Sequence, residues 1–196
     1  MLILHASCLP ADPEGRGVAR AAQSAAAKRL LCEVADALHL PSAPITVTDR
    51  GRPYFEGLSN VDFSLTHTKG LAVCALQQRQ SDPPPRLGID AEVLTDFDDA
   101  KIGAFSLRFF GKHEQAYLEG ASDRPAAFTE IFVRKESYAK YVGDGLGKHL
   151  SATDTMHPDF EKSVGVRFYS YRKNGCFICL CVSRSCDEQP IWFKRS

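Results

Sequence analysis

The strongest constraint on the fold is a pair of apolar, strand-like segments that occurs twice in the chain. The segments predict antiparallel hairpins, formed by 61–68 with 71–77 and by 164–172 with 177–183. The second pair turns at the Asn-Gly step of 174–175, and Asn-Gly is a strong signal for a tight hairpin turn. A helical pattern precedes each hairpin. We therefore expect an α+β fold in two halves, each with a helix followed by antiparallel strands.

The remaining elements follow from helical spacing and from turn residues. An Ala-rich stretch predicts a helix that ends near residue 39, before Pro41 and Pro44. Other predicted elements are short strands at 2–6, 45–48 and 88–93 and helices at about 98–109, 112–119 and 125–142. The polar, proline-rich segment 77–86 separates the halves. We expect a single unit made of an N-terminal half of about 1–84 and a C-terminal half of about 85–196.

Charge and cysteine content narrow the classes of function. Lys plus Arg and Asp plus Glu each number 24, so the net charge is zero and a broad nucleic-acid surface is not favoured. No apolar run approaches the roughly 18–20 residues of a membrane span, and the apolar start lacks the basic leader of a signal peptide. Seven cysteines cannot all pair within one chain, which indicates reduced thiols and a cytoplasmic protein. The run of Cys176, Cys179 and Cys181 is flanked by apolar residues and is more typical of a buried strand than of a zinc site.

The segment LGIDAEV at 87–93 places two carboxylates on one face of a strand. Because side chains alternate along a strand, Asp90 and Glu92 point the same way, opposite to Ile89 and Ala91. Neighbouring acids repel each other and are poor strand formers, so a cation nearby would compensate them. Mg²⁺ favours a few carboxylates combined with phosphate oxygens. A solvated strand face is the plainer alternative.

The predicted helix at 128–142 carries a lysine in an unusual place. Lys135 falls within the apolar arc, where an ammonium group needs an anionic partner, and a phosphate would serve. Glu136 and Lys140 lie together at the edge of this arc, four residues apart, as an ordinary surface pair would also do. Three glycines follow the helix and would allow close backbone approach to a ligand: Gly143, Gly145 and Gly147.

Further residues suited to holding an anion lie in the first half. His67 ends a predicted strand beside Thr66 and Lys69, just before a turn where a phosphate could be held. Arg52 precedes Pro53 in a tight turn. The first helix adds several cations, which are Arg16, Arg20, Lys28 and Arg29. Each of these residues alone is equally well explained as surface charge.

Taken in order, these motifs resemble those of the 4'-phosphopantetheinyl transferases, specifically the double-length type that activates surfactin synthetase. That family shows a Gly-(Lys/Arg)-Pro turn, a Ser-His strand end, Gly-x-Asp-x-Glu, Phe-Phe with a nearby Glu, Trp-x-x-Lys-Glu-Ala-x-x-Lys and Gly-x-Gly-Leu. This chain has GRP at 51–53, LTH at 65–67, GIDAE at 88–92, FFGKHE at 109–114, FVRKESYAK at 132–140 and GDGL at 143–146. Thr66, Phe132 and Ser137 replace the family's Ser, Trp and Ala, and none of these changes removes a charged group.

The resemblance implies a fold of two pseudo-symmetric halves, with coenzyme A bound in the cleft between them. The 4'-phosphopantetheine arm would pass to a serine of an acyl or peptidyl carrier protein, leaving 3',5'-ADP. The implied ligands of Mg²⁺, or of Mn²⁺ in its place, are Asp90, Glu92 and Glu136. The implied catalytic residues are Asp90, Glu136 and Lys140, with the identity of the general base left open.

The resemblance also assigns contacts with coenzyme A. Lys140 and Lys135 would contact phosphates. The nucleotide end with its 3'-phosphate would be held by Arg52, Thr66 and His67, with Arg20 and Lys28 as looser matches. Glu114 matches the family's acid after the Phe-Phe pair, and its role stays open.

Two other functions suit the same residues. One is an Mg²⁺-dependent hydrolase of a nucleotide pyrophosphate, and the other is a non-catalytic relative that binds coenzyme A or carrier proteins. For the transferase, carriers of fatty-acid, polyketide and nonribosomal-peptide synthesis all remain open. We expect a monomer, because a chain of two halves can complete the site alone. We expect no nucleic-acid or membrane partner.

Overall fold

In the first part of the chain, one helix packs on a sheet made by the strands around it. The structure, a computed structural model, describes residues 1–9, 18–80, 86–95, 97–143 and 150–193. The elements of this first part are β1 (Leu2–Cys8), α1 (Val18–Ala37), β2 (Ile45–Val47), β3 (Pro53–Phe55), β4 (Val61–Thr68) and β5 (Leu71–Gln78). β5 lies between β1 and β4 and runs antiparallel to both, as the hairpin pattern predicted. β2 and β3 form a separate two-stranded ribbon.

The second part repeats this plan with extra helices. Its elements are β6 (Leu87–Val93), α2 (Asp99–Phe109), α3 (Lys112–Gly120), α4 (Arg124–Val142), α6 (Phe160–Val164), β7 (Val166–Lys173) and β8 (Cys176–Ser183). β8 lies between β6 and β7 and is antiparallel to both. α4 begins after Asp123, whose side chain accepts a hydrogen bond from the backbone N–H of Ala126, and it ends at Gly143 in the left-handed conformation.

The two parts are related by pseudo-symmetry. The run β1–α1–β4–β5 corresponds to β6–α4–β7–β8, because the sheet orders β4-β5-β1 and β7-β8-β6 match element by element. The predicted α+β fold with a helix and antiparallel strands in each half is therefore confirmed. One strand crosses between the halves: β9 (Ile191–Trp192) returns to the first sheet and pairs in parallel with β1. The boundary near residue 84 stays a prediction, and β9 adds a late segment to the first half.

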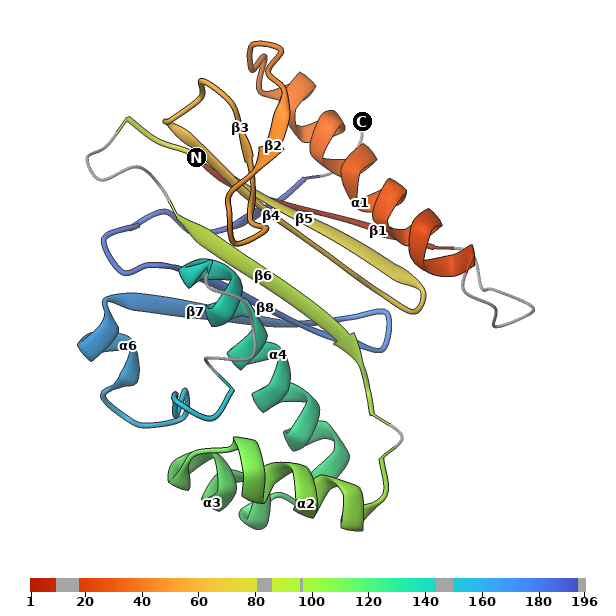
Figure 1. Cartoon of the computed structure of the whole chain (residues 1–196), viewed down its shortest axis with the longest axis vertical. Coiled ribbons are helices and arrows are strands. Elements are labelled where there is room, and N and C mark those ends of the chain that lie inside the picture. Colours follow the sequence, from red (N-terminus) through yellow and green to blue (C-terminus); the bar gives the residue numbers. More distant parts are fainter. Residues whose placement is uncertain (10–17, 81–85, 96, 144–149, 194–196) are drawn as a thin grey trace.

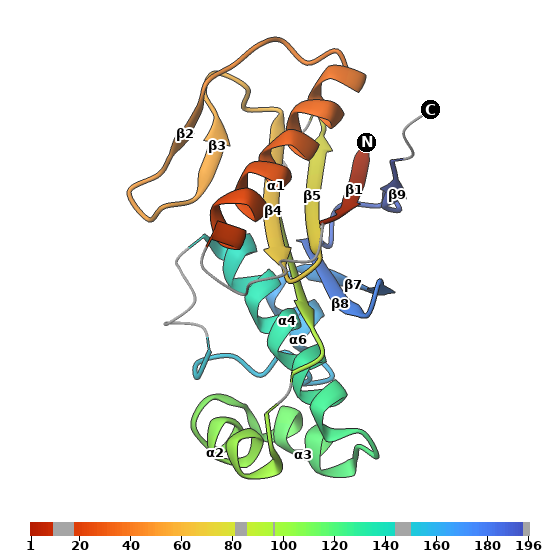
Figure 2. The same cartoon turned by 90° about the vertical axis from the view of Figure 1, so that its right-hand side faces the viewer.

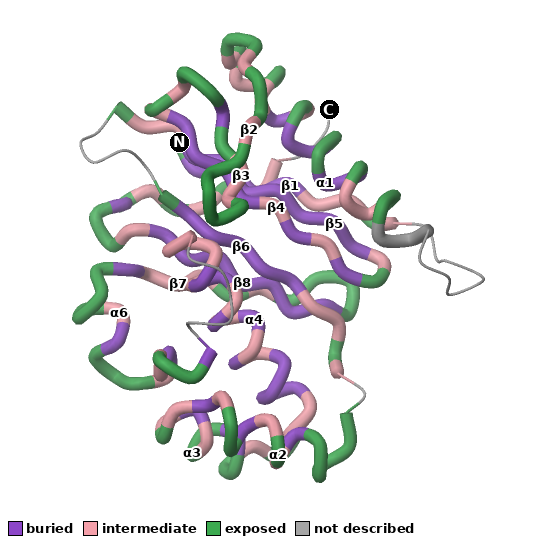
Figure 3. The backbone as a smooth tube through the Cα atoms, viewed as in Figure 1, coloured by how far each residue is buried: buried purple, intermediate pink, exposed green. Residues whose placement is uncertain are grey.

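The core lies in three layers. α1 packs on one face of the first sheet, with Leu31 and Val34 against Ala72 and Leu76 among others. The other face of that sheet shares a core with the second sheet, and α4 covers the far side of the second sheet. Figures 1 and 2 show α1 and α4 at opposite sides of the paired sheets, and Figure 3 shows that the central strands are buried.

The cysteine run is part of this core. Cys176, Cys179 and Cys181 lie on β8 and are at most 2% exposed, as expected for a buried strand. Burial raises the pKa of the Cys179 thiol to about 11. Within the described ranges, no helix combines the length and the apolarity that a membrane crossing requires.

Candidate active site

Two adjoining hollows open where the halves meet. A hollow of about 230 Å³ is lined by Arg52 and Ser64 from the first half and by Glu136, Lys140 and Gly143 from the second. A neighbouring hollow of about 320 Å³ shares some of this lining, and its polar residues are Thr66, His67, Asp90, Glu92, Glu136 and Lys140. Segments far apart in the sequence therefore meet in one polar cleft between the halves. Such a cleft is the usual form of a small-molecule site.

The two acids of β6 enter this cleft on the same face of the strand. Oδ1 of Asp90 accepts hydrogen bonds from the Thr66 hydroxyl at 2.9 Å and from Lys140 Nζ at 2.6 Å. Oε1 of Glu92 accepts from the Thr68 hydroxyl and from the backbone N–H of Val93. The sequence therefore placed both carboxylates on the correct face, but it did not show that Thr66 and Thr68 bind them.

Gly88 explains how β6 comes so close to the helix that carries the other site residues. A Cβ atom at this position would lie 2.2 Å from the carbonyl oxygen of Ser137 and 2.3 Å from the backbone nitrogen of Tyr141, both on α4. Contacts this short with backbone atoms exclude any side chain. The absence of a side chain at Gly88 thus brings Asp90 within reach of α4.

α4 supplies a carboxylate and an ammonium group to the same cleft. Glu136 and Lys140 lie one helical turn apart and both line the two hollows. Burial raises the pKa of Glu136 to about 7, and the nearby charge of Asp90 adds to the shift, whereas Lys140 opposes it. A carboxylate with a pKa near 7 can gain or lose a proton at neutral pH.

The donor chemistry of the cleft fits a hard divalent cation. Asp90, Glu92 and Glu136 line one hollow, and their mutual repulsion contributes to the raised pKa of Glu136. Oxygen ligands of this kind suit Mg²⁺ or Mn²⁺. Across the described ranges, no group of three or more His, Cys, Asp or Glu side chains is already arranged around a metal position. Binding a cation would therefore require these carboxylates to move closer together.

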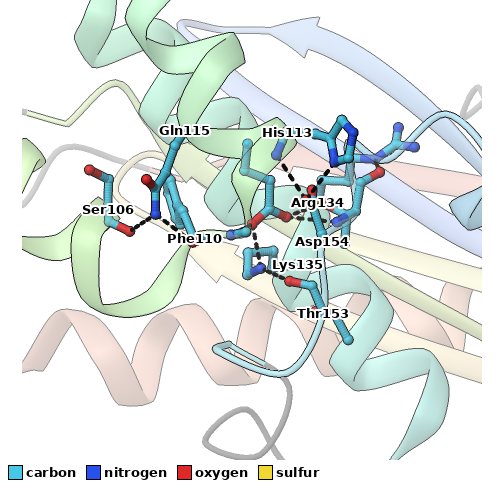
Figure 4. Close-up of polar contacts among 11 residues, drawn as sticks. Ser106, Phe110, His113, Gln115, Arg134, Lys135, Thr153 and Asp154 are labelled. Atoms are coloured by element: carbon cyan, nitrogen blue, oxygen red, sulfur yellow. Dashed lines mark hydrogen bonds and ion pairs between the residues drawn. The ribbon is translucent and has the colours of Figure 1, made fainter.

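Lys135 lies elsewhere, and the expectation that a phosphate is its partner needs correction. Its side chain is 0% exposed, and its Nζ donates to Glu114 Oε2 at 2.6 Å and to the carbonyl oxygen of Thr153. Figure 4 shows Lys135 pointing toward Thr153, and Lys135 is absent from the lining of both hollows. Burial lowers the pKa of Lys135, and the Glu114 charge opposes that shift. The anionic partner that the sequence demanded is thus a carboxylate of the protein itself.

This pairing also gives Glu114 a place in the structure. Its Oε2 accepts a second hydrogen bond, from the backbone N–H of Gly111 at 2.8 Å, and its Oε1 accepts two from Thr155. Glu114 therefore joins the start of α3, the segment around Thr155 and the buried side of α4. Its location indicates a structural role, since it lies outside the lining of both hollows.

Arg52 lines the cleft, yet its guanidinium group is engaged by the protein. It donates to Asp62 Oδ2 at 2.5 Å, to the carbonyl oxygen of Leu87 at 2.8 Å and to the carbonyl oxygen of Lys140. These contacts join the first half to β6 and to the last turn of α4. Binding of a nucleotide phosphate by Arg52 stays a prediction, and the structure adds a role in holding the halves together.

The other predicted binding residues divide into two groups. Thr66 and His67 line the cleft. Lys28 is exposed on α1 and is absent from the lining of both hollows. The side chain of Arg20 and the glycines Gly145 and Gly147 lie outside the described residues.

A third, more apolar hollow of about 700 Å³ also includes Glu92 in its lining. It is lined by Lys69, Glu92, Val93, Leu94, Thr95, Phe97, Phe105, Phe128, Thr129 and Phe132. Phe132 belongs both to this hollow and to the polar one, so the two adjoin at the aromatic position of the α4 motif.

Comparison with known proteins agrees with this geometry. Residues 86–189 match the family model of the 4'-phosphopantetheinyl transferase superfamily, which is more than half of the chain. The chain belongs to the 4'-phosphopantetheinyl transferase superfamily. The match covers β6 and α4, so the superfamily pattern includes the acids and the helix that meet in the cleft.

Relatives within the superfamily are similar over only part of their length. 4'-phosphopantetheinyl transferase HetI from Nostoc sp. is 32% identical over 92 residues, which are 46% of this chain and 36% of the relative. 4'-phosphopantetheinyl transferase gsp from Aneurinibacillus migulanus is 28% identical over 113 residues, 56% of this chain and 43% of the relative. The L-aminoadipate-semialdehyde dehydrogenase-phosphopantetheinyl transferase of Saccharomyces cerevisiae is 22% identical over 170 residues, 81% of this chain and 62% of the relative. The aligned chain thus spans less than two thirds of each of these relatives.

Proposed function

We propose that this chain transfers the 4'-phosphopantetheine arm of coenzyme A to a serine of an acyl or peptidyl carrier protein. Membership of the superfamily supports this reaction, and the relatives' names describe the same kind of transfer. The observation that carries the proposal is the meeting of Asp90 on β6 with Glu136 and Lys140 on α4 in the cleft between the halves. A cleft with acids and a lysine at close range suits a pyrophosphate with a divalent cation.

In the proposed reaction, the serine hydroxyl oxygen attacks the β-phosphorus of coenzyme A. A new P–O bond forms to the serine, and the bond from this phosphorus to the bridging oxygen breaks. 3',5'-ADP leaves with the bridging electron pair. Glu136 accepts the serine proton, because its carboxylate lies in the same cleft as Asp90 and Lys140. A different base that takes the serine proton through a water molecule would leave the balance of atoms and charges in this step unchanged.

The remaining groups bind and orient the reactants. Mg²⁺ bound by Asp90, Glu92 and Glu136 would supply charge neutralisation at the pyrophosphate. Lys140 supplies a positive charge to the same cleft and changes partner from Asp90 to phosphate when substrate binds. The apolar hollow beside Glu92 and Phe132 suits the pantetheine arm or the apolar face of a carrier helix.

The test is an intact-mass assay with a panel of apo carrier proteins, coenzyme A and Mg²⁺, with EDTA as a control. Carriers should gain one phosphopantetheine, and EDTA should abolish the gain. Asp90→Asn and Glu136→Gln should each lower the rate by at least about 100-fold. Glu119→Gln, which alters an exposed carboxylate on α3, should leave the rate unchanged.

The competing functions give different results in the same assay. Consumption of coenzyme A without any carrier gain would indicate a pyrophosphate hydrolase. Intact coenzyme A and unmodified carriers across a broad panel would favour a binding protein without catalysis. Near wild-type transfer by folded Asp90→Asn and Glu136→Gln would remove the residue assignment. We also propose that a single chain forms the whole site, and a mass measurement in solution should give a monomer.

A further inference from the structure

The halves meet along a line of polar side chains on β4. Four alternate residues of this strand point toward the second half and are 5–8% exposed: Asp62, Ser64, Thr66 and Thr68. The intervening residues Val61, Phe63 and Leu65 pack toward α1 instead. We call the four polar residues the β4 seam. Burying a polar side chain costs free energy unless it has a hydrogen-bond partner, so each residue of the β4 seam needs one.

The first two seam residues bind the backbone of β6. Asp62 Oδ2 accepts from the backbone N–H of Leu87 at 2.8 Å, and Ser64 Oγ accepts from the backbone N–H of Ile89 at 3.1 Å. β6 is an edge strand, since it pairs with β8 on one side only. The seam therefore covers the open edge of β6 with side-chain acceptors in place of a neighbouring strand.

The last two seam residues bind the acids of the cleft. Thr66 donates to Asp90 Oδ1 at 2.9 Å, and Thr68 donates to Glu92 Oε1. The four contacts follow one another in the same order along β4 and β6. The hydrogen bonds to the backbone N–H groups of Leu87 and Ile89 therefore fix the register in which Thr66 and Thr68 reach Asp90 and Glu92. The seam thus continues without a break from a structural contact into the candidate site.

The contacts engage one oxygen of each acid. Among the described residues, the hydrogen bonds to Asp90 go to Oδ1 and those to Glu92 go to Oε1, which leaves Oδ2 and Oε2 for a cation. A hydrogen bond to one carboxylate oxygen fixes the direction of the other, as hydrogen bonds do for metal ligands in general.

We propose that Thr68 is a positioning residue that orients Glu92 for the divalent cation. This inference rests on the proposed function, and it assigns Thr68 a role that acts through Glu92 without contact with substrate. Thr68 is the informative position because Asp90 has Lys140 as a second side-chain partner, whereas within the described ranges Thr68 supplies the side-chain hydrogen bond to Glu92.

The test compares Thr68→Val with Thr68→Ser. Valine keeps the shape of threonine and removes the hydroxyl, whereas serine keeps the hydroxyl and removes the methyl group. Thr46→Val is the matched control, since Thr46 is a half-buried threonine on β2 outside the seam. The primary readout is Mn²⁺ affinity of the full chain in the presence of coenzyme A, from the electron paramagnetic resonance signal of free Mn²⁺, with thermal unfolding to establish folding.

We expect Thr68→Val to bind Mn²⁺ about 10- to 100-fold more weakly than the wild type, which is the usual effect of losing an outer hydrogen bond to a metal ligand. Thr68→Ser should lie within about threefold of the wild type, because the charge-assisted hydrogen bond is retained. Thr46→Val should match the wild type. In the transfer assay, Thr68→Val should raise the Mg²⁺ concentration for half-maximal rate more than it lowers the maximal rate.

Two results would overturn the inference: Mn²⁺ affinity of Thr68→Val equal to that of the wild type, or affinity of Thr68→Ser as weak as that of Thr68→Val. A wild-type chain that fails to bind Mn²⁺ would overturn it too. The proposed function fails separately: Mn²⁺ binding that depends on the Thr68 hydroxyl, without transfer to any carrier, supports the positioning role and refutes the transferase.

Discussion

Replacing Lys135 by methionine should destabilise the chain severely, although it removes a charge from an apolar core. Lys135 and Glu114 are both 0% exposed, and the Nζ–Oε2 distance is 2.6 Å. Methionine fills a similar volume, so cavity formation adds little. The main cost is the Glu114 carboxylate, which stays buried with its charge uncompensated.

The magnitude follows from that burial. Loss of one partner of a buried ion pair costs about 3–5 kcal/mol. For a chain of this length, each kcal/mol shifts the melting temperature by about 2–4 °C, so Lys135→Met should melt about 6–20 °C below the wild type. Glu114→Gln should cost a similar amount, because Lys135 loses its counter-charge. The double variant should cost less than the sum of the singles by at least about 2 kcal/mol.

The assay is urea unfolding of the wild type, both single variants and the double variant, followed by circular dichroism. Lys101→Met provides the control, since Lys101 forms an exposed pair with Asp98 at 3.7 Å and should change the free energy of unfolding by less than about 1 kcal/mol. Additive single effects, or a Lys135→Met cost no larger than that of Lys101→Met, would refute the reasoning.

Two further predictions concern the site. Gly88→Ala should prevent native folding, since its Cβ would overlap the backbone of Ser137 and Tyr141. The control is Gly103→Ala on α2, where a Cβ meets nothing within 4 Å, and it should stabilise the chain by about 0.5–1 kcal/mol. Equal melting curves of the two variants would contradict this prediction. Folding raises the pKa of Glu136 from 4.5 to about 7, so the folded chain holds this proton at pH values where the unfolded chain has released it. The contribution of Glu136 to the stability of the folded chain is therefore lost as the pH rises from about 4.5 to 7. Between pH 5 and pH 8 in metal-free buffer, the free energy of unfolding of the wild type should therefore fall by about 1–3 kcal/mol relative to that of Glu136→Gln. Parallel pH profiles of the two proteins would contradict this prediction.

Local patterns in the sequence were enough to predict the hairpins and the face of β6 on which Asp90 and Glu92 lie. Alternation along a strand and an Asn-Gly turn are set by neighbouring residues, so they can be read without knowledge of the tertiary structure. The same holds for the need of Lys135 for an anion, because helical spacing alone places it among apolar residues.

The identity of each partner could not be read in this way. The anion at Lys135 is Glu114, which lies on another helix, and a carboxylate and a phosphate satisfy the same requirement from the sequence side. Arg52 and Thr68 were equally ambiguous. A basic residue in a turn and a hydroxyl at a strand end are common, and only the packing of the halves shows that Arg52 meets Asp62 and that Thr68 meets Glu92.

The return of β9 to the first sheet has a consequence for the order in which the nascent chain can fold. β9 pairs with β1 at Ile3 and Leu4, and the amino group of Met1 meets Glu188, 187 residues later. During translation, β1, α1, β4 and β5 emerge early and can associate, but the outer edge of β1 stays open until β9 leaves the ribosome. The half that is made first is therefore completed only after the strands of the second half have been made.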